Sequence, residues 1–162
     1  MKRVALSVAT LVTAGAVGIA AFGLTRSDDS GEKCFAQAGE AAVAACTQAI
    51  KSGRFSGAEL ASIYDNRAIE LRQQGDFDRA IADYTAALRI DAELTGAYTG
   101  RGLAWEGKAE ADKAKADYRK ALTVAQKYDD GQWAHDTARG RLVALGDLGS
   151  TTSRATSEGV ID

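Results

Sequence analysis

Two stretches of this chain, residues 64–91 and 98–125, share one pattern at a fixed offset. Tyr64, Arg67, Ala80, Asp83, Tyr84, Ala87 and Leu88 recur 34 positions later as Tyr98, Arg101, Ala114, Asp117, Tyr118, Ala121 and Leu122. Repeats of about 20 to 50 residues are typical of stacked supersecondary units, and this length suits a pair of helices. The chain contains no proline, so long helices are allowed. We therefore predict an all-α fold, a short α-solenoid of antiparallel helical hairpins.

Cap and turn residues set the helix boundaries within the first of these stretches. Ser56 and Glu59 have the spacing of a capping box, which predicts a helix start directly after Ser56. Gly75 is expected to end this helix, and Asp76 to cap the second helix of the hairpin. The second copy has Ala109-Glu110 at the equivalent turn, so its turn carries no such marker.

Weaker patterns extend the solenoid on both sides. Residues 42–50 match residues 80–88 at an offset of 38, which indicates a degenerate first repeat. Because the end of a solenoid needs a cover, we also predict a C-terminal capping helix. The predicted repeat domain spans residues 34–146, with a degenerate repeat at 34–54, repeats at 61–94 and 95–128, and the capping helix at 132–145. Residues 147–162, rich in Gly, Ser and Thr, are predicted to form a disordered tail.

The N-terminal segment predicts export. Residues 4–24 carry no charge and follow Lys2 and Arg3. As a helix this run would be roughly 31 Å long, enough to cross a hydrocarbon core of about 30 Å. We predict that residues 1–24 form either a cleaved signal peptide or a signal anchor, followed by a polar tether at 25–33. The protein would then be periplasmic, secreted, or tethered in the inner membrane through residues 4–24 and facing the periplasm.

Cys34 and Cys46 are the two cysteines of the chain. In an exported protein an even number of cysteines predicts a disulfide, and closing this short loop would stabilise the fold by about 2 to 3 kcal/mol. Metal binding is the rival interpretation, but two thiols without a nearby His or third Cys cannot fill a tetrahedral zinc site. We predict a Cys34–Cys46 disulfide and neither a metal site nor a cofactor.

Three motifs of the central repeat resemble the tetratricopeptide repeat: Tyr64-Asp65-Asn66-Arg67-Ala68, Gly75-Asp76-Phe77-Asp78-Arg79-Ala80-Ile81 and Tyr84-Thr85-Ala86-Ala87-Leu88. With the leader and the segment around Cys46, the chain is similar to small exported bacterial proteins of this family. The resemblance covers about residues 34–128. It implies a protein-binding module in which the first helix of each repeat lines a concave face, and it places these residues there: Asp65, Asn66, Ile69, Arg72, Gln73, Thr99, Leu103 and Glu106.

On that face, the sequence differs from some members of the family at the positions that bind a peptide. Some relatives hold the terminal carboxylate of a peptide with a Lys and two Asn. Asp65 and Ile69 stand in the places of that Lys and of one Asn. The sequence therefore departs from this carboxylate clamp.

Catalysis gains no support from the sequence. His135 is the single histidine, no recognised motif joins it to a nucleophile, and phosphate-loop and His-Glu-x-x-His patterns are absent. A net charge of −2 gives no support to nucleic-acid binding. We predict a non-enzymatic module that binds a protein or peptide segment, without a sequence feature that identifies this partner. The alternative is a structural protein that forms a homo-oligomer through the end faces of the solenoid.

Overall fold

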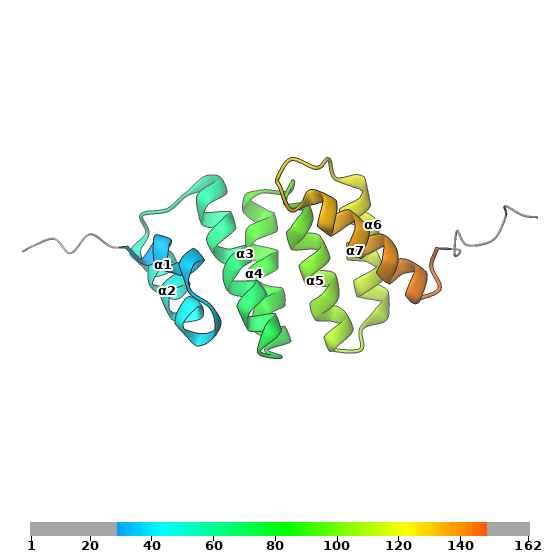
Figure 1. Cartoon of the computed structure of the whole chain (residues 1–162), viewed down its shortest axis with the longest axis horizontal. Helices are drawn as coiled ribbons and strands as arrows, with labels where there is room; N and C mark the ends of the chain where they lie inside the picture. The colour runs from blue at the N-terminus through cyan, green and yellow to red at the C-terminus, as the bar shows by residue number, and fades with distance from the viewer. Residues whose placement is uncertain (1–28, 149–162) are drawn as a thin grey trace, which may run out of the picture.

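The computed structural model describes residues 29–148, which contain seven helices and no strand. The helices are α1 (Ser30–Ala36), α2 (Gly39–Ser52), α3 (Gly57–Gln73), α4 (Phe77–Ile90), α5 (Thr95–Gly107), α6 (Ala111–Thr123) and α7 (Gly131–Ala144). Helices α1 and α2, α3 and α4, and α5 and α6 pair as hairpins, and α7 packs on α5 and α6 (Figure 1). The predicted all-α solenoid with a closing helix is confirmed.

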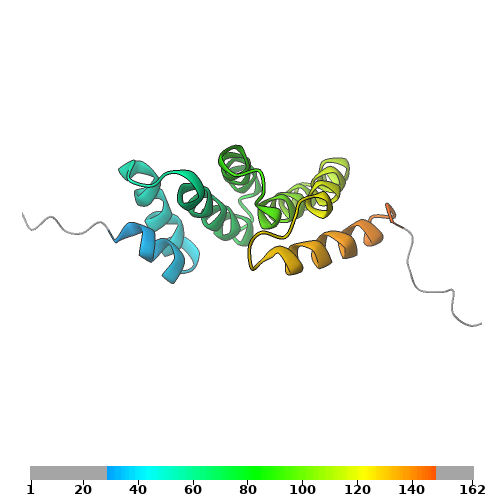
Figure 2. The same ribbon diagram turned by 90° about the horizontal axis from the view of Figure 1, so that it is seen from above.

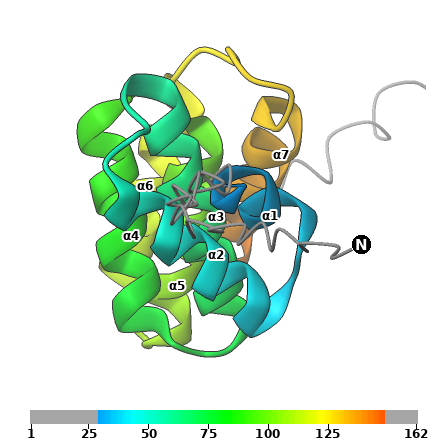
Figure 3. The ribbon, with the colours of Figure 1, turned by 90° about the vertical axis from the view of Figure 1, so that its left-hand side faces the viewer.

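The helices form two layers. Seen from above, α2, α4 and α6 lie along one side of the row, and α1 and α7 project on the other side beyond α3 and α5 (Figure 2). The end view likewise shows α4 and α6 opposite α1 and α7, with α3 between them (Figure 3). The inner side of the solenoid is therefore concave, with α3 and α5 at its base and α1 and α7 at its two ends.

Small residues let these layers approach closely. Ala68, Ala80 and Ala87 are fully buried at the positions where α3 meets α4. Tyr118 is also fully buried, and a Cβ atom on Gly102 would lie 2.5 Å from its ring. The repeated tyrosines and small residues are thus complementary parts of one core.

The turns of the two full repeats have the same geometry despite different residues. Gly75 has a φ of 80° and Ala109 a φ of 60°, both in the left-handed region. In each turn the next residue donates its backbone N–H to a carbonyl oxygen of the preceding helix, over 2.9 Å. A left-handed alanine costs about 1 to 2 kcal/mol. Packing of α5 against α6 therefore imposes a turn that the sequence does not mark.

The capping box predicted at the start of α3 is wrong. Ser56 is the N-cap residue and has extended backbone angles, but its side chain makes no capping hydrogen bond. Asp76, in contrast, caps α4 as predicted, because its carboxylate accepts from the backbone N–H of Arg79 at 3.2 Å. Helix α3 begins directly after Ser56, as predicted, but no side-chain hydrogen bond from Ser56 caps it.

Helix α1 begins at Ser30, inside the stretch predicted as a tether. The reason is tertiary packing: a Cβ on Gly31 would lie 2.6 Å from the ring of Phe55, so the bare glycine lets this ring lie on the helix. The predicted signal segment at 1–24 and the tail beyond Leu148 lie outside the described residues. Within residues 29–148, none of the helices has the length and apolar character needed to cross a membrane.

Candidate protein-binding face

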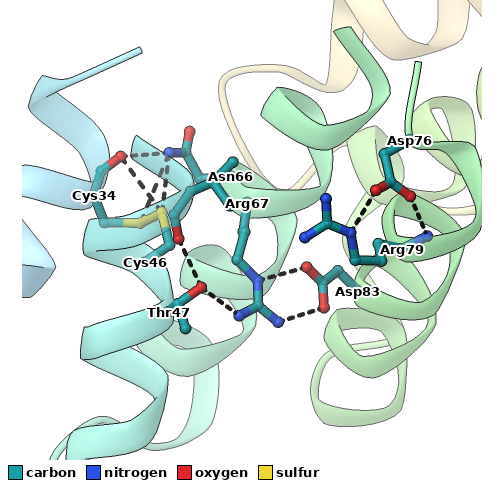
Figure 4. Close-up of polar contacts among 9 residues, drawn as sticks. Cys34, Cys46, Thr47, Asn66, Arg67, Asp76, Arg79 and Asp83 are labelled. Carbon is teal, nitrogen blue, oxygen red and sulfur yellow. Dashed lines mark hydrogen bonds and ion pairs between the residues drawn. A yellow bond between two sulfur atoms is a disulfide. The ribbon is translucent and has the colours of Figure 1, made fainter. Parts of the chain in front are cut away.

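The first repeat is joined to the second by a disulfide and a hydrogen bond. Cys34 of α1 and Cys46 of α2 form the predicted disulfide, and both residues are fully buried (Figure 4). Asn66 of α3 donates from its amide nitrogen to the carbonyl oxygen of Cys34 at 2.6 Å. Asn66, which the sequence placed among the partner-binding residues, thus holds α1 against α3.

A partly buried arginine joins each full repeat to the one before it. Arg67 donates from Nε and Nη2 to the carboxylate of Asp83, both at 2.7 Å, and from Nη1 to Thr47 Oγ1 at 2.9 Å (Figure 4). We call this Arg–Asp–Thr contact the repeat latch. It connects α3 to α4 in the same repeat and to α2 in the preceding repeat.

The repeat latch recurs in the second copy. Arg101 donates to Asp117 at 2.8 and 2.7 Å, and to Thr85 Oγ1 at 3.0 Å. The recurrence of the Arg and Asp was visible in the sequence, but the Thr was missed. Thr47 precedes its arginine by 20 residues and Thr85 precedes its arginine by 16, so an insertion hides the common pattern.

Helix α7 covers the inner face of α5. Thr99 is fully buried and donates to a carbonyl oxygen of α7 at 3.1 Å, and Leu103 packs in the same cluster as α7. Glu106 accepts from Arg141 Nε of α7 at 2.9 Å and from the Tyr118 hydroxyl at 2.5 Å. These hydrogen bonds, first that of Arg141, lower the pKa of Glu106. Three predicted binding residues therefore already have partners within the fold.

The other predicted residues lie in α3. Gln73 is exposed, and Ile69 is partly buried against the central core. Asp65 Oδ1 and Arg72 Nε are buried atoms without a hydrogen-bond partner within the described part of the chain. Leaving such a group unsatisfied costs about 1 to 3 kcal/mol, and more where it is charged. The structure thus separates Asp65 and Arg72 from the residues that only support the fold.

Tyr84 adds a third unsatisfied group. Its side chain is fully buried, and its hydroxyl has no hydrogen-bond partner among residues 29–148. A Cβ on Gly100 would lie 2.5 Å from that hydroxyl oxygen, so the hydroxyl lies on the backbone of α5. Burial raises the pKa of Tyr84 and Asp65 adds to the rise, while Arg72 opposes it. Arg72 is therefore near the hydroxyl, but no pair of their atoms has hydrogen-bond geometry.

Asp130, the N-cap residue of α7, has a charge that acts on Asp65. Its side chain lies over Gly96 of α5, where a Cβ atom would overlap it. The charge of Asp130 is one of the two causes that raise the pKa of Asp65. We call Asp65, Tyr84 and Asp130, together with the bare backbone at Gly96 and Gly100, the acidic site.

Sequence reasoning found only Asp65 of the acidic site. Tyr84 was expected in the core, and Asp130 lay in a connection with no repeat partner. The paired glycines of α5, four residues apart, were the available indication, because they remove side chains from one helix face. Only the packing of α7 on α5 shows what occupies that space.

His135 has a structural role. Its Nε2 lies 3.1 Å from the carbonyl oxygen of Val124, and its Nδ1 lies 2.9 Å from the side-chain nitrogen of Gln126. These partners indicate that Nε2 carries the proton and that Nδ1 accepts. The ring thereby holds the α6–α7 connection on α7. In the part of the chain that is described, no group of three or more His, Cys, Asp or Glu side chains could hold a metal ion.

Asp65 should make the stability of the protein depend on pH. Its pKa is raised from 3.8 to about 7, first by burial and second by Asp130. The folded state then keeps a proton that the unfolded chain has lost, so stability falls as pH rises from about 4 to about 7. We expect Asp65→Asn to be more stable than the wild type near pH 8, by up to about 4 kcal/mol. The gain should vanish near pH 4.

Urea unfolding of the full chain across this pH range measures the difference. Asp112→Asn, at an exposed carboxylate of α6, is the matched control and should leave the wild-type curve unchanged. A gain for Asp65→Asn that stays constant with pH would contradict the assignment. Asp130 also has a raised pKa and contributes to the pH dependence of both proteins. The difference between Asp65→Asn and the wild type therefore reports on Asp65.

Comparisons with known proteins identify the repeat. The family model described as "Tetratricopeptide repeat" matches residues 61–94, the bounds predicted for the central repeat. No curated protein matches the chain. Among solved structures, the chain is similar to the Arabidopsis OM64 TPR domain, with 30% sequence identity and a TM-score of 0.55. That match covers 68% of this chain and 92% of the other. The chain therefore belongs to the tetratricopeptide repeat family.

Proposed function

We propose that this chain is a small exported bacterial module that binds a protein or peptide segment on its concave face. The family to which it belongs generally mediates protein–protein interactions and is typically non-enzymatic. The observation that carries the proposal is the inner face of α3, where Asp65 and Arg72 each have a buried polar atom with no partner in residues 29–148. A bound segment would satisfy both atoms and offset their cost.

We place this module in the cell envelope. The buried disulfide supports an oxidising compartment, because such bonds are rare in the cytosol. The uncharged run at 4–24 supports export and suits either a removed signal peptide or a tether to the inner membrane. In the tethered form the repeats would face the periplasm.

Charge reversal at Arg72 tests the proposal. In cells that produce the full chain, we expect Arg72→Glu to reduce recovery of a crosslinked envelope partner at least about tenfold, because a lost charged contact costs 1.4 kcal/mol or more. Arg89→Glu is the control, since Arg89 is exposed in the last turn of α4 in the outer layer. Equal recovery from both variants would argue against binding on the concave face.

A second candidate function is self-association through the end faces of the solenoid. Large apolar side chains are exposed on the terminal helices, among them Phe35 on α1 with 53% and Trp133 on α7 with 52% of the residue exposed. Light scattering of the full chain distinguishes the two functions. A tight dimer that Phe35→Ser dissociates would support self-association, and a monomer would contradict it.

A further inference from the structure

A cavity of about 250 Å³ opens between α2 and α4. It is lined by the repeat latch of Arg67 and by Val43, Leu71, Arg79 and Ala82. We propose that this cavity, the outer groove, binds a tryptophan side chain of a partner protein segment. The inference goes beyond the proposed function, because α2 and α4 belong to the outer layer of the solenoid and not to its concave side (Figure 2).

The outer groove exists because the two outer helices are held apart. Within the described residues, no Cα atom of α2 lies within 8 Å of one in α4, and side chains of α3 line the space between them. Only 2% of Leu71 is exposed, so it lies at the bottom of the groove. Arg79 and Ala82 of α4 are exposed and lie at its opening. The groove is therefore open to solvent on the outer surface.

The second repeat shows which side chain suits this position. Its repeat latch has the same three residue types as the first, and Ala82 has its counterpart 34 positions later in Ala116. The large difference is at the bottom of the groove, where Leu71 of the first repeat corresponds to Trp105 of the second. The second repeat therefore carries an indole of its own where the first has a leucine and a cavity.

A cation covers the indole of the second repeat. Lys113 Nζ lies 4.6 Å from the centroid of the Trp105 ring, and the same ammonium pairs with Glu110 at 3.4 Å. The corresponding residues of the first repeat, Arg79 and Asp76, form an ion pair as well. Arg79 thus has the position of Lys113, but it lines a cavity instead of covering a ring.

The size and the apolar lining of the groove suit one aromatic side chain. Its volume of about 250 Å³ is below the roughly 300 to 1,000 Å³ of sites for drug-sized ligands. A cavity of about 150 Å³ is enough to hold benzene, so a larger ring has room here. Val43, Leu71 and Ala82 provide the apolar surface on which such a ring would pack.

The cation at the opening distinguishes an aromatic ring from other ligands. A guanidinium stacks on aromatic faces, and its attraction is strongest for tryptophan. A leucine side chain would pack on the apolar bottom but would gain nothing from Arg79. A carboxylate would compete with Asp76 for Arg79 and would approach the negative charge of Asp83. The lining therefore favours tryptophan over both alternatives.

Titration with short blocked peptides tests the inference. The probes are acetyl-Gly-Ser-Trp-Ser-Gly-amide and the same peptide with leucine or glutamate in place of tryptophan. Backbone amide NMR shifts of the full chain in non-ionic detergent micelles report binding. We expect the tryptophan probe to shift Val43, Leu71 and Ala82 saturably, and the leucine and glutamate probes to bind at least about fivefold more weakly.

Variants that fill the groove make the test specific. Leu71→Trp gives the first repeat the side chain of the second, and we expect it to weaken binding of the tryptophan probe at least about tenfold. Ala82→Phe blocks the exposed opening without changing the core and should have the same effect. Its matched control is Ala116→Phe, at the exposed counterpart in α6, which should bind like the wild type. Arg79→Met removes the cation and should weaken binding about threefold.

Three results would overturn the inference. The first is equal binding of the tryptophan and leucine probes, or equal effects of Ala82→Phe and Ala116→Phe. The second is stronger binding of the glutamate probe, which would make the groove a site for an anion. The third concerns a second copy of the chain, whose exposed Trp133 is a rival occupant. If the Ala82 shift changes with protein concentration and Trp133→Ser removes this change, the groove binds another copy and not a separate partner.

Discussion

Replacing Arg67 with methionine is expected to lower the free energy of unfolding by about 3 kcal/mol. Methionine keeps helix propensity and most of the side-chain length, so the change removes the charge and its hydrogen bonds. Asp83 would be left without its cation, and the Asp83 side chain is only 9% exposed. Thr47 would lose its donor as well. Urea unfolding of the full chain measures the loss.

The structure supplies matched comparisons for this prediction. Arg101→Met removes the second repeat latch and should cost a similar amount. Arg79→Met breaks an ion pair with Asp76 in which the arginine side chain is 65% exposed, and it should cost no more than about 0.5 kcal/mol. Combining Arg67→Met with Asp83→Leu should recover part of the loss, because the unpaired buried carboxylate is gone. Equal effects of Arg67→Met and Arg79→Met would show that burial of the latch does not matter.

Removing the disulfide is expected to lower the free energy of unfolding by about 3 kcal/mol. The bond closes a loop with a sequence separation of 12 and restricts the unfolded chain. It also holds α1, a helix of 7 residues that is too short to be stable alone. In the double variant Cys34→Ala and Cys46→Ala, we expect α1 to lose protection from hydrogen exchange before α3 to α6 do.

Asn66→Ala provides the comparison for the disulfide. It removes the hydrogen bond to the Cys34 carbonyl but leaves the covalent bond, so the expected loss is smaller, about 1 to 2 kcal/mol. If the double cysteine variant unfolded at the same urea concentration as the wild type, the disulfide would not stabilise the domain. If α1 stayed protected without it, packing of Phe55 on Gly31 would be sufficient to hold the helix.

The repeat pattern predicted much of the fold because it records local requirements. The order of the hairpins, the buried small residues and the Asp76 cap all follow from spacings of a few residues along one helix or turn. The turn at Ala109 and the early start of α1 were not predictable in this way. In both places packing between helices imposes a backbone that the local residues do not specify.

The same distinction between local pattern and helix packing applies to the residues of the candidate site. Periodicity predicted Asp65, Arg72 and Gln73 on the inner face of α3, and all three residues lie in that helix. It also placed Thr99 and Glu106 on the inner face of α5, but it could not show that α7 covers them. A helix period gives the face on which a side chain lies. It does not give which later helix packs on that face.

The sequence by itself determined the helical hairpins, their number and order, and the pairing of the two cysteines. The hairpins follow from the periodicity of the sequence, and a chain with two cysteines can form one internal disulfide. Only the tertiary structure decided which inward residues remain without partners, because this depends on α7 packing on α5. Hydrogen-bond satisfaction is a property of neighbours in space, so the acidic site emerges only when four helices are assembled.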